Sequence, residues 1–117
     1  MNVVVLRGTL PRAPEVRDLP GGGQVVAFDL AVVGGDGTPA RVPVAWSAPD
    51  RTLAALASGV EVLVTGEVRR RFFRAGGATQ SRTEVVAAAV VPTRRPRGVA
   101  SALEAARQAL AGPCPAP

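Results

Sequence analysis

The stretch that decides the fold is residues 60–91, which read VEVLVTGEVRRRFFRAGGATQSRTEVVAAAVV. Its first half alternates between apolar and polar residues with period two, which is typical of a strand with one buried face. The apolar positions on that face are Val60, Val62, Val64 and Val68. The sequence Ala75-Gly76-Gly77-Ala78 then predicts a turn that sends the chain back into a second strand over residues 81–91. The stretch therefore predicts a long β-hairpin.

Three further strands are predicted before this hairpin, over residues 3–10, 24–33 and 41–46. The strand over residues 24–33 alternates most clearly, and Phe28 falls on its apolar face, which we interpret as core packing. Gly8 predicts a bulge or a sharp bend in the first strand. Pro43 predicts an edge or a bulged position for the third strand. A short extended piece is expected at residues 15–17.

A short helix is predicted over residues 51–58, between the third and fourth strands. Asp50 suits the N-cap position, and Gly59 suits the end of the helix. The order of elements predicts an all-β fold, namely a five-stranded OB-fold barrel with an extended hairpin between its fourth and fifth strands. A generic β-sandwich stays open as the alternative on periodicity alone.

The composition points to a small basic domain. The chain has 117 residues, which suits one domain, and Phe, Trp and Met together number only five, so Val, Leu and Ala must build the core. The net charge is +5, every one of the 14 basic residues is Arg, and the pI is near 11.4. This balance predicts a polyanionic partner, with nucleic acid as the first candidate and an anionic membrane surface as the second.

Several functional classes are disfavoured by the residues that the chain lacks. It has no His, its single Cys114 lies near the terminus, and its carboxylates are scattered, so we expect neither an enzyme nor a metal or cofactor site. No apolar segment approaches the roughly 18 residues that cross a bilayer, and the start of the chain lacks the features of a signal peptide. We therefore expect a cytoplasmic protein that is not bound to a membrane.

Residues 69–74, Arg69-Arg70-Arg71-Phe72-Phe73-Arg74, carry the most chemistry. In a strand each face would combine Arg with Phe, and burying several unpaired guanidinium groups would cost too much. We therefore predict a protruding ribbon, wet on both sides, where Arg holds phosphates and Phe stacks on bases. The alternative is a charged hairpin whose rings pack between subunits, and one of Phe72 and Phe73 is expected to be structural. Trp46, at the end of the third strand, is left open between core and contact.

An ordered set of segments resembles the bacterial single-stranded DNA-binding protein family. These segments span residues 1 to about 92 and include Met1-Asn2-Val3-Val4-Val5-Leu6-Arg7-Gly8, Pro14-Glu15-Val16-Arg17, Val26-Ala27-Phe28-Asp29-Leu30-Ala31, Val64-Thr65-Gly66-Glu67-Val68-Arg69 and Thr83-Glu84-Val85-Val86. The resemblance implies an OB-fold domain over residues 1–92 and a separate tail over residues 93–117. It also implies a homo-oligomer, with a tetramer favoured over a dimer, around which single-stranded DNA wraps.

Residue by residue, the resemblance implies that Trp46 and Phe73 are the stacking aromatics and that Arg69 and Arg71 are basic contacts of the ribbon. The predicted DNA-binding set is completed by Arg74, Phe72, Arg41 and Arg7. Binding without sequence preference would serve DNA replication, recombination or repair in the nucleoid, with no cofactor.

The chain also departs from the family pattern. Two aromatics are replaced, at about Ala40 and at Ser81, and the second hairpin is shortened to Gly34-Gly35-Asp36-Gly37. Lost stacking contacts are worth about 1–3 kcal/mol each, so binding should rely on Arg and phosphate and should depend steeply on salt.

The tail is basic rather than acidic. Ser101 and Glu104 have capping-box spacing, and Val99, Leu103, Ala106 and Leu110 could line one side of a short helix near residues 101–111. Simple disorder is the alternative for this tail. Residues 112–117 carry no acid, so recruitment of partners through the tail is not expected, and we interpret the chain as a short paralogue.

Two other functions stay open. An OB-fold interaction or accessory subunit, akin to primosomal OB proteins, would explain the missing aromatics and would bind nucleic acid weakly. An RNA-binding role is also compatible, because nothing in the sequence reports on the 2′-OH.

Overall fold

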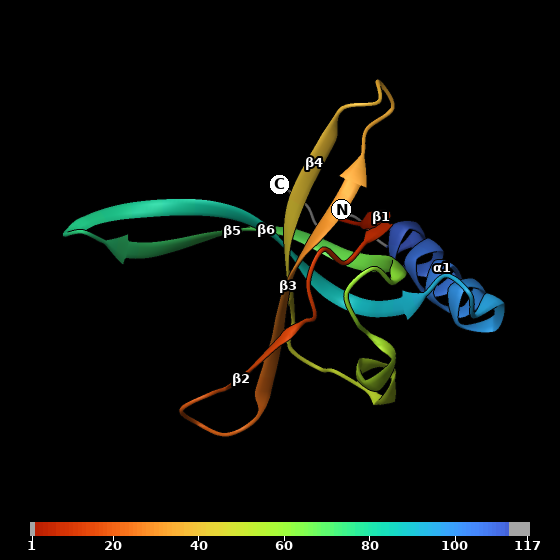
Figure 1. Ribbon diagram of the computed structural model, residues 1–117, viewed down its shortest axis with the longest axis horizontal. Helices are drawn as coiled ribbons and strands as arrows, with labels where there is room; N and C mark the ends of the chain where they lie inside the picture. Colours follow the sequence, from red (N-terminus) through yellow and green to blue (C-terminus); the bar gives the residue numbers. More distant parts are fainter. Residues whose placement is uncertain (1, 113–117) are drawn as a thin grey trace.

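The computed structural model describes residues 2–112. Six strands, a 3-10 helix and one α-helix follow in the order β1 (Val4–Thr9), β2 (Glu15–Asp18), β3 (Gln24–Val33), β4 (Pro39–Trp46), η1 (Arg51–Ala55), β5 (Glu61–Ala75), β6 (Ala78–Pro92) and α1 (Pro96–Ala111). The strands form one sheet with the order β1-β5-β6-β4-β3-β2 (Figure 1). The expected extended piece after β1 is a short strand, β2, which pairs with β3 and raises the number of strands above the predicted five.

The sheet turns back on itself because β1 contacts two strands. It pairs along its length with β5 and also pairs with β3 through Thr9 and Ala31. Gly8 makes this approach possible, because a Cβ there would run into the carbonyl oxygen of Ala31. The pairing with β5 continues through Gly8 and Val62, so the predicted bulge at Gly8 is not present. This mostly β arrangement is consistent with an OB-fold.

The predicted helix before the long hairpin is wrong in length and type. It is the single 3-10 turn η1, and the α-helix of the described residues lies at the C-terminal end instead. Asp50 does cap it, since its carboxylate accepts a hydrogen bond from the Thr52 N–H at 2.8 Å. The Thr52 hydroxyl also donates to this carboxylate, and the hydrogen bonds from the Thr52 side chain and backbone lower the pKa of Asp50. The helix ends early because Leu56 adopts an extended conformation and inserts into the core.

The position of Pro43 also differs from the prediction. β4 lies inside the sheet order, between β6 and β3, rather than at an edge. Its parallel pairing with β6 involves only Val44 and Ala45, which follow Pro43 directly. Pro43 has no N–H to donate, so its place just outside this ladder leaves no hydrogen bond unmade there.

The core is built from aliphatic side chains with two aromatic rings. Phe28 is buried, as its place on the apolar face of β3 predicts. Trp46 is the largest buried side chain. The remaining buried members of this cluster are Leu10, Val26, Leu30, Val44, Leu56, Val62, Val64, Val85, Ala87 and Val90.

The tail forms a longer helix than expected, and it packs on the sheet. α1 begins at Pro96, so Ser101 lies inside the helix and the capping box is not used. Ala102 is buried against Leu63 and Val91 of the hairpin base, whereas Leu103 and Leu110 are exposed. Of the predicted apolar side, Val99 packs against this cluster and Ala106 is half-buried, so the buried side is shifted from Leu103 and Leu110 toward Ala102. Residues 113–117, with Cys114 and most of the acid-free end, lie outside the described residues.

The long hairpin of β5 and β6 extends well beyond the body of the molecule (Figure 1). Its turn falls at Gly76 and Gly77, which both have positive φ. A register shift between Thr65 and Gly66 separates the packed base of the hairpin from its outer part, which is exposed over residues 67–74 of β5 and 78–83 of β6. We call this outer part, residues 67–86, the ribbon. No helix among residues 2–112 is long and apolar enough to cross a membrane.

Candidate nucleic-acid interface

The register of the ribbon decides which side chains share a face. Residues directly opposite each other in an antiparallel pair lie on the same face, and the faces alternate along each strand. Arg71 is opposite Arg82 and Phe73 is opposite Gln80, so these four residues share one face with Arg69. We call it the Arg82 face. The other face, which we call the Phe72 face, carries Arg70, Phe72, Arg74, Thr79, Ser81 and Thr83.

The inner end of the Arg82 face holds a buried carboxylate. The Glu84 side chain is only 4% exposed, and its Oε1 accepts a hydrogen bond from the Arg69 Nη2 at 3.0 Å. A buried carboxylate is costly unless it is paired, so this bond fixes Arg69 over the base of the ribbon. Arg69 is therefore partly committed to Glu84, although its guanidinium remains solvent-accessible.

Farther out, the Arg82 face is basic and apolar. Phe73 is 38% exposed, so part of its ring is accessible to a ligand. Within residues 2–112, neither Arg71 nor Arg82 forms an ion pair. On the Phe72 face, Phe72 is 66% exposed and lies between Arg70 and Arg74. Both faces of the ribbon thus combine Arg with Phe, as predicted.

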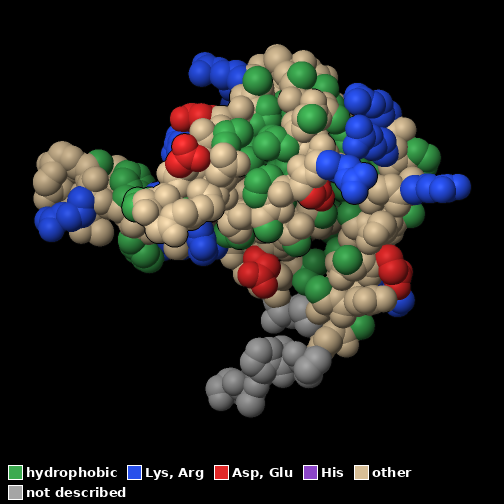
Figure 2. Space-filling view, turned by 90° about the horizontal axis from the view of Figure 1, so that it is seen from below, with side chains coloured by type: hydrophobic (Ala, Val, Ile, Leu, Met, Phe, Trp, Pro, Cys, Tyr) green, Lys and Arg blue, Asp and Glu red, His purple; other side chains and the backbone are tan. Residues whose placement is uncertain are grey.

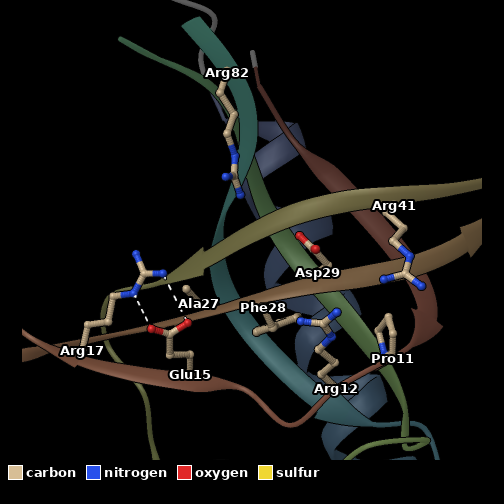
Figure 3. A pocket seen from close by; sticks show the side chains of 9 residues that line it. All are labelled: Pro11, Arg12, Glu15, Arg17, Ala27, Phe28, Asp29, Arg41 and Arg82. Atoms are coloured by element: carbon tan, nitrogen blue, oxygen red, sulfur yellow. Dashed lines mark hydrogen bonds and ion pairs between the residues drawn. The ribbon is translucent and has the colours of Figure 1, made fainter. Parts of the chain in front are cut away.

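A pocket on the body adjoins the Arg82 face. It has a volume of about 250 Å³ and is lined by Pro11, Arg12, Glu15, Arg17, Ala27, Phe28, Asp29, Arg41 and Arg82. The guanidinium ends of Arg12, Arg41 and Arg82 point into it from three different parts of the chain (Figure 3). We call this the arginine pocket. It places Arg41, which was predicted as a contact, in the lining of the same pocket as Arg82, which was not.

One arginine of the pocket is neutralised and the others are not. Arg17 donates to Glu15 through its Nε at 3.1 Å and its Nη2 at 3.3 Å. This hydrogen bond and the attraction between the charges lower the pKa of Glu15 and raise that of Arg17. Among the described residues, Arg12 and Arg41 have no carboxylate within ion-pair distance. Asp29 adds a second carboxylate to the lining, so four arginines face two carboxylates and the pocket keeps an excess of positive charge that suits an anion.

Arg7 lies apart from these residues. It forms an ion pair with Glu61 at 2.9 Å and does not line the arginine pocket. The Thr93 hydroxyl donates to the same carboxylate at 2.7 Å. The hydrogen bond from Thr93 and then the one from Arg7 lower the pKa of Glu61.

Trp46, which the resemblance assigns to stacking, is buried in the structure. The residue is 1% exposed and its ring packs inside the core, so no base can stack on it in this structure. Trp46 is the last residue of β4, where the face that carries Val42 and Val44 turns inward. Its Nε1–H has no hydrogen-bond partner among the described residues. The core role, which the residues alone left open, is the one that the structure gives it.

Sequence reasoning missed Arg12, Arg17 and Arg82. Arg82 could have been predicted from the sequence, because counting back from a two-residue turn at Gly76 and Gly77 places it opposite Arg71. Arg12 and Arg17 had no such signal, since only the fold brings the segment after β1 beside β3 and β4. The space-filling view shows arginine side chains standing out both along the hairpin and on the body (Figure 2).

Comparison with known proteins identifies a family for most of the chain. A model of the single-strand binding protein family matches residues 1–92, which is most of the chain. No curated protein matches the chain.

Within the described part of the chain, no group of three or more His, Cys, Asp or Glu side chains is placed to hold a metal ion.

Proposed function

Because the chain belongs to the single-strand binding protein family, we propose that it binds single-stranded DNA without strong sequence preference through the Arg82 face and the arginine pocket. It performs no catalysis in this proposal and acts by covering the strand. The observation that carries the proposal is the accessible ring of Phe73 on the same face as Arg69 and Arg71. A ring among guanidinium groups suits a strand whose bases stack while its phosphates are neutralised.

The predicted residues take different parts in this proposal. Phe73 stacks on a base, and Arg71 and Arg41 neutralise phosphates. Arg69 contributes less than predicted, because Glu84 already accepts one of its N–H groups. Arg7 contributes little for the same reason, since it is paired with Glu61 away from the pocket.

Two further predicted contacts lie on the other side of the ribbon. Phe72 and Arg74 belong to the Phe72 face, so one segment of DNA on the Arg82 face does not reach them. They contact DNA if the strand wraps around the ribbon, as it would on an oligomer. We propose a homo-oligomer, with a tetramer favoured, that protects single strands in replication, recombination or repair in the cytoplasm.

A titration of fluorescently labelled oligo-dT tests this function. Anisotropy is expected to report tight binding at 50 mM salt and much weaker binding at 200 mM, because Arg–phosphate contacts release counterions. Duplex DNA of equal length is the control for general charge attraction, and oligo-rU tests RNA. Absence of oligo-dT binding at 50 mM salt by the folded protein would refute the proposal.

One observation supports the alternative function as an accessory subunit. With Trp46 in the core, Phe73 is the one predicted stacking residue left on the Arg82 face. Each missing stack is worth about 1–3 kcal/mol, so affinity depends more strongly on arginine than the resemblance implies. Binding that vanishes near physiological salt, together with a stable protein partner, would favour this alternative.

A further inference from the structure

One cross-strand pair of the ribbon places two positive charges opposite each other. Arg71 of β5 lies directly opposite Arg82 of β6. Like charges in that position destabilise a sheet, whereas opposite charges stabilise it. No carboxylate of the described residues lies within 4.0 Å of either guanidinium.

The neighbouring pairs show how unusual this one is. Arg69 faces Glu84, which neutralises it, and Arg70 faces the small neutral Thr83. Beyond Arg71, each residue up to Arg74 also faces a neutral side chain. The repulsion in the ribbon is thus concentrated at one pair, and an anion between the two guanidinium groups would turn it into attraction.

Arg82 also belongs to the arginine pocket. Its side chain points from β6 toward the space that Arg12 and Arg41 enter from other elements (Figure 3). Arg71 does not line the pocket. Arg82 is therefore the arginine that joins the ribbon to the body, and it lies on the face that also carries Phe73.

We propose that Arg71 and Arg82 together hold one phosphate of the bound strand, and that Arg82 leads the strand from the ribbon into the arginine pocket. The base next to that phosphate stacks on Phe73, two residues from Arg71 on the same face. Guanidinium groups suit this position because their planar N–H forks bind phosphate oxygens in pairs. The inference rests on the proposed function and adds to it a contact residue, Arg82, and a direction for the strand.

A double-mutant cycle on the full chain tests the shared phosphate. Arg71→Ala and Arg82→Ala are each expected to weaken oligo-dT binding on the order of tenfold at low salt. One phosphate on a single strand contributes about 0.7 to the slope of log K against log salt. The double variant should therefore lose about 0.7 from the slope of one subunit's site, whereas two independent phosphates would lose about 1.4. Arg97→Ala, with the same charge change on the exposed surface of α1, is the matched control and should keep the slope.

Thermal melting of the unbound protein separates binding from folding. Because either single substitution removes the repulsion, both variants should melt at or above the wild-type temperature while binding more weakly. A lower melting temperature together with weaker binding would assign Arg82 a structural role and overturn the proposal.

Oligonucleotide length tests the direction of the strand. Arg41→Ala should weaken an oligo-dT of about 15 nucleotides more than one of about 4, because only the longer one reaches from the ribbon into the pocket. Equal effects on both lengths would overturn the path. If wild type binds oligo-dT and Arg82→Ala binds equally well, this inference fails and the proposed function stands. If wild type does not bind, the proposed function itself fails.

Discussion

Substitution of Trp46 separates a core residue from a stacking residue. The ring is fully buried, and its Nε1–H has no partner among the described residues. Trp46→Ala should lower the free energy of unfolding by about 3–5 kcal/mol, as for other buried large aromatics. Trp46→Phe should cost far less. The smaller ring leaves a cavity of roughly 40 Å³, worth about 1 kcal/mol, whereas loss of the unpartnered N–H recovers about 1–3 kcal/mol.

The two variants are measured by urea denaturation followed by far-UV circular dichroism and by oligo-dT anisotropy. Trp46→Phe is expected to stay within about 2 kcal/mol of wild type in stability. Its affinity for oligo-dT should change less than twofold, because the ring does not touch the strand. In the unbound wild type, the emission of Trp46 should be blue-shifted relative to an exposed tryptophan.

One result would refute this reasoning. If Trp46→Ala folds with wild-type stability and loses DNA binding to the extent that a stacking contact is worth, then Trp46 is a contact residue. That contact is worth about 1–3 kcal/mol, or roughly 5- to 150-fold in affinity. The family resemblance would then assign its role correctly, and the buried placement would be wrong.

Three further predictions concern the ribbon, an ion pair and a glycine. Phe73→Leu should weaken oligo-dT binding by roughly 5- to 150-fold without changing the oligomer seen by light scattering. Phe72→Leu, the control on the other face, should have a smaller effect. Dissociation of the Phe73→Leu variant into folded subunits would make Phe73 an interface residue instead. The lowered pKa of Glu61 means that its stabilising contribution is present above the ordinary pKa of a glutamate and is lost as pH falls through the lowered value. Glu61→Gln should therefore reduce the melting temperature at neutral pH and converge with wild type in acid, and a constant difference across that range would contradict the assignment. Gly66→Ala should destabilise strongly, because its Cβ would strike the carbonyl of the facing strand, while Gly21→Ala, in open space, should melt like wild type.

Much of the local structure follows from residues that are neighbours in the chain. The alternation in residues 24–33 predicts β3 and the burial of Phe28, and both are present. The turn at Gly76 and Gly77 predicts the long hairpin, which is present, whereas the pairing of Arg71 with Arg82 was missed although counting along the hairpin gives it. These features depend on periodicity and turn chemistry, which a sequence carries directly.

The sequence by itself determined a basic, mostly β chain with a protruding ribbon of Arg and Phe. Only the tertiary structure decided which way Trp46 faces, because that depends on how β4 packs against β3 and β6. It also decided that α1 begins at Pro96 and covers the hairpin base through Ala102, where packing against Leu63 and Val91 outweighs the local capping signal. The arginine pocket is likewise a product of the fold, since segments far apart in the chain meet there and no local pattern records their distance.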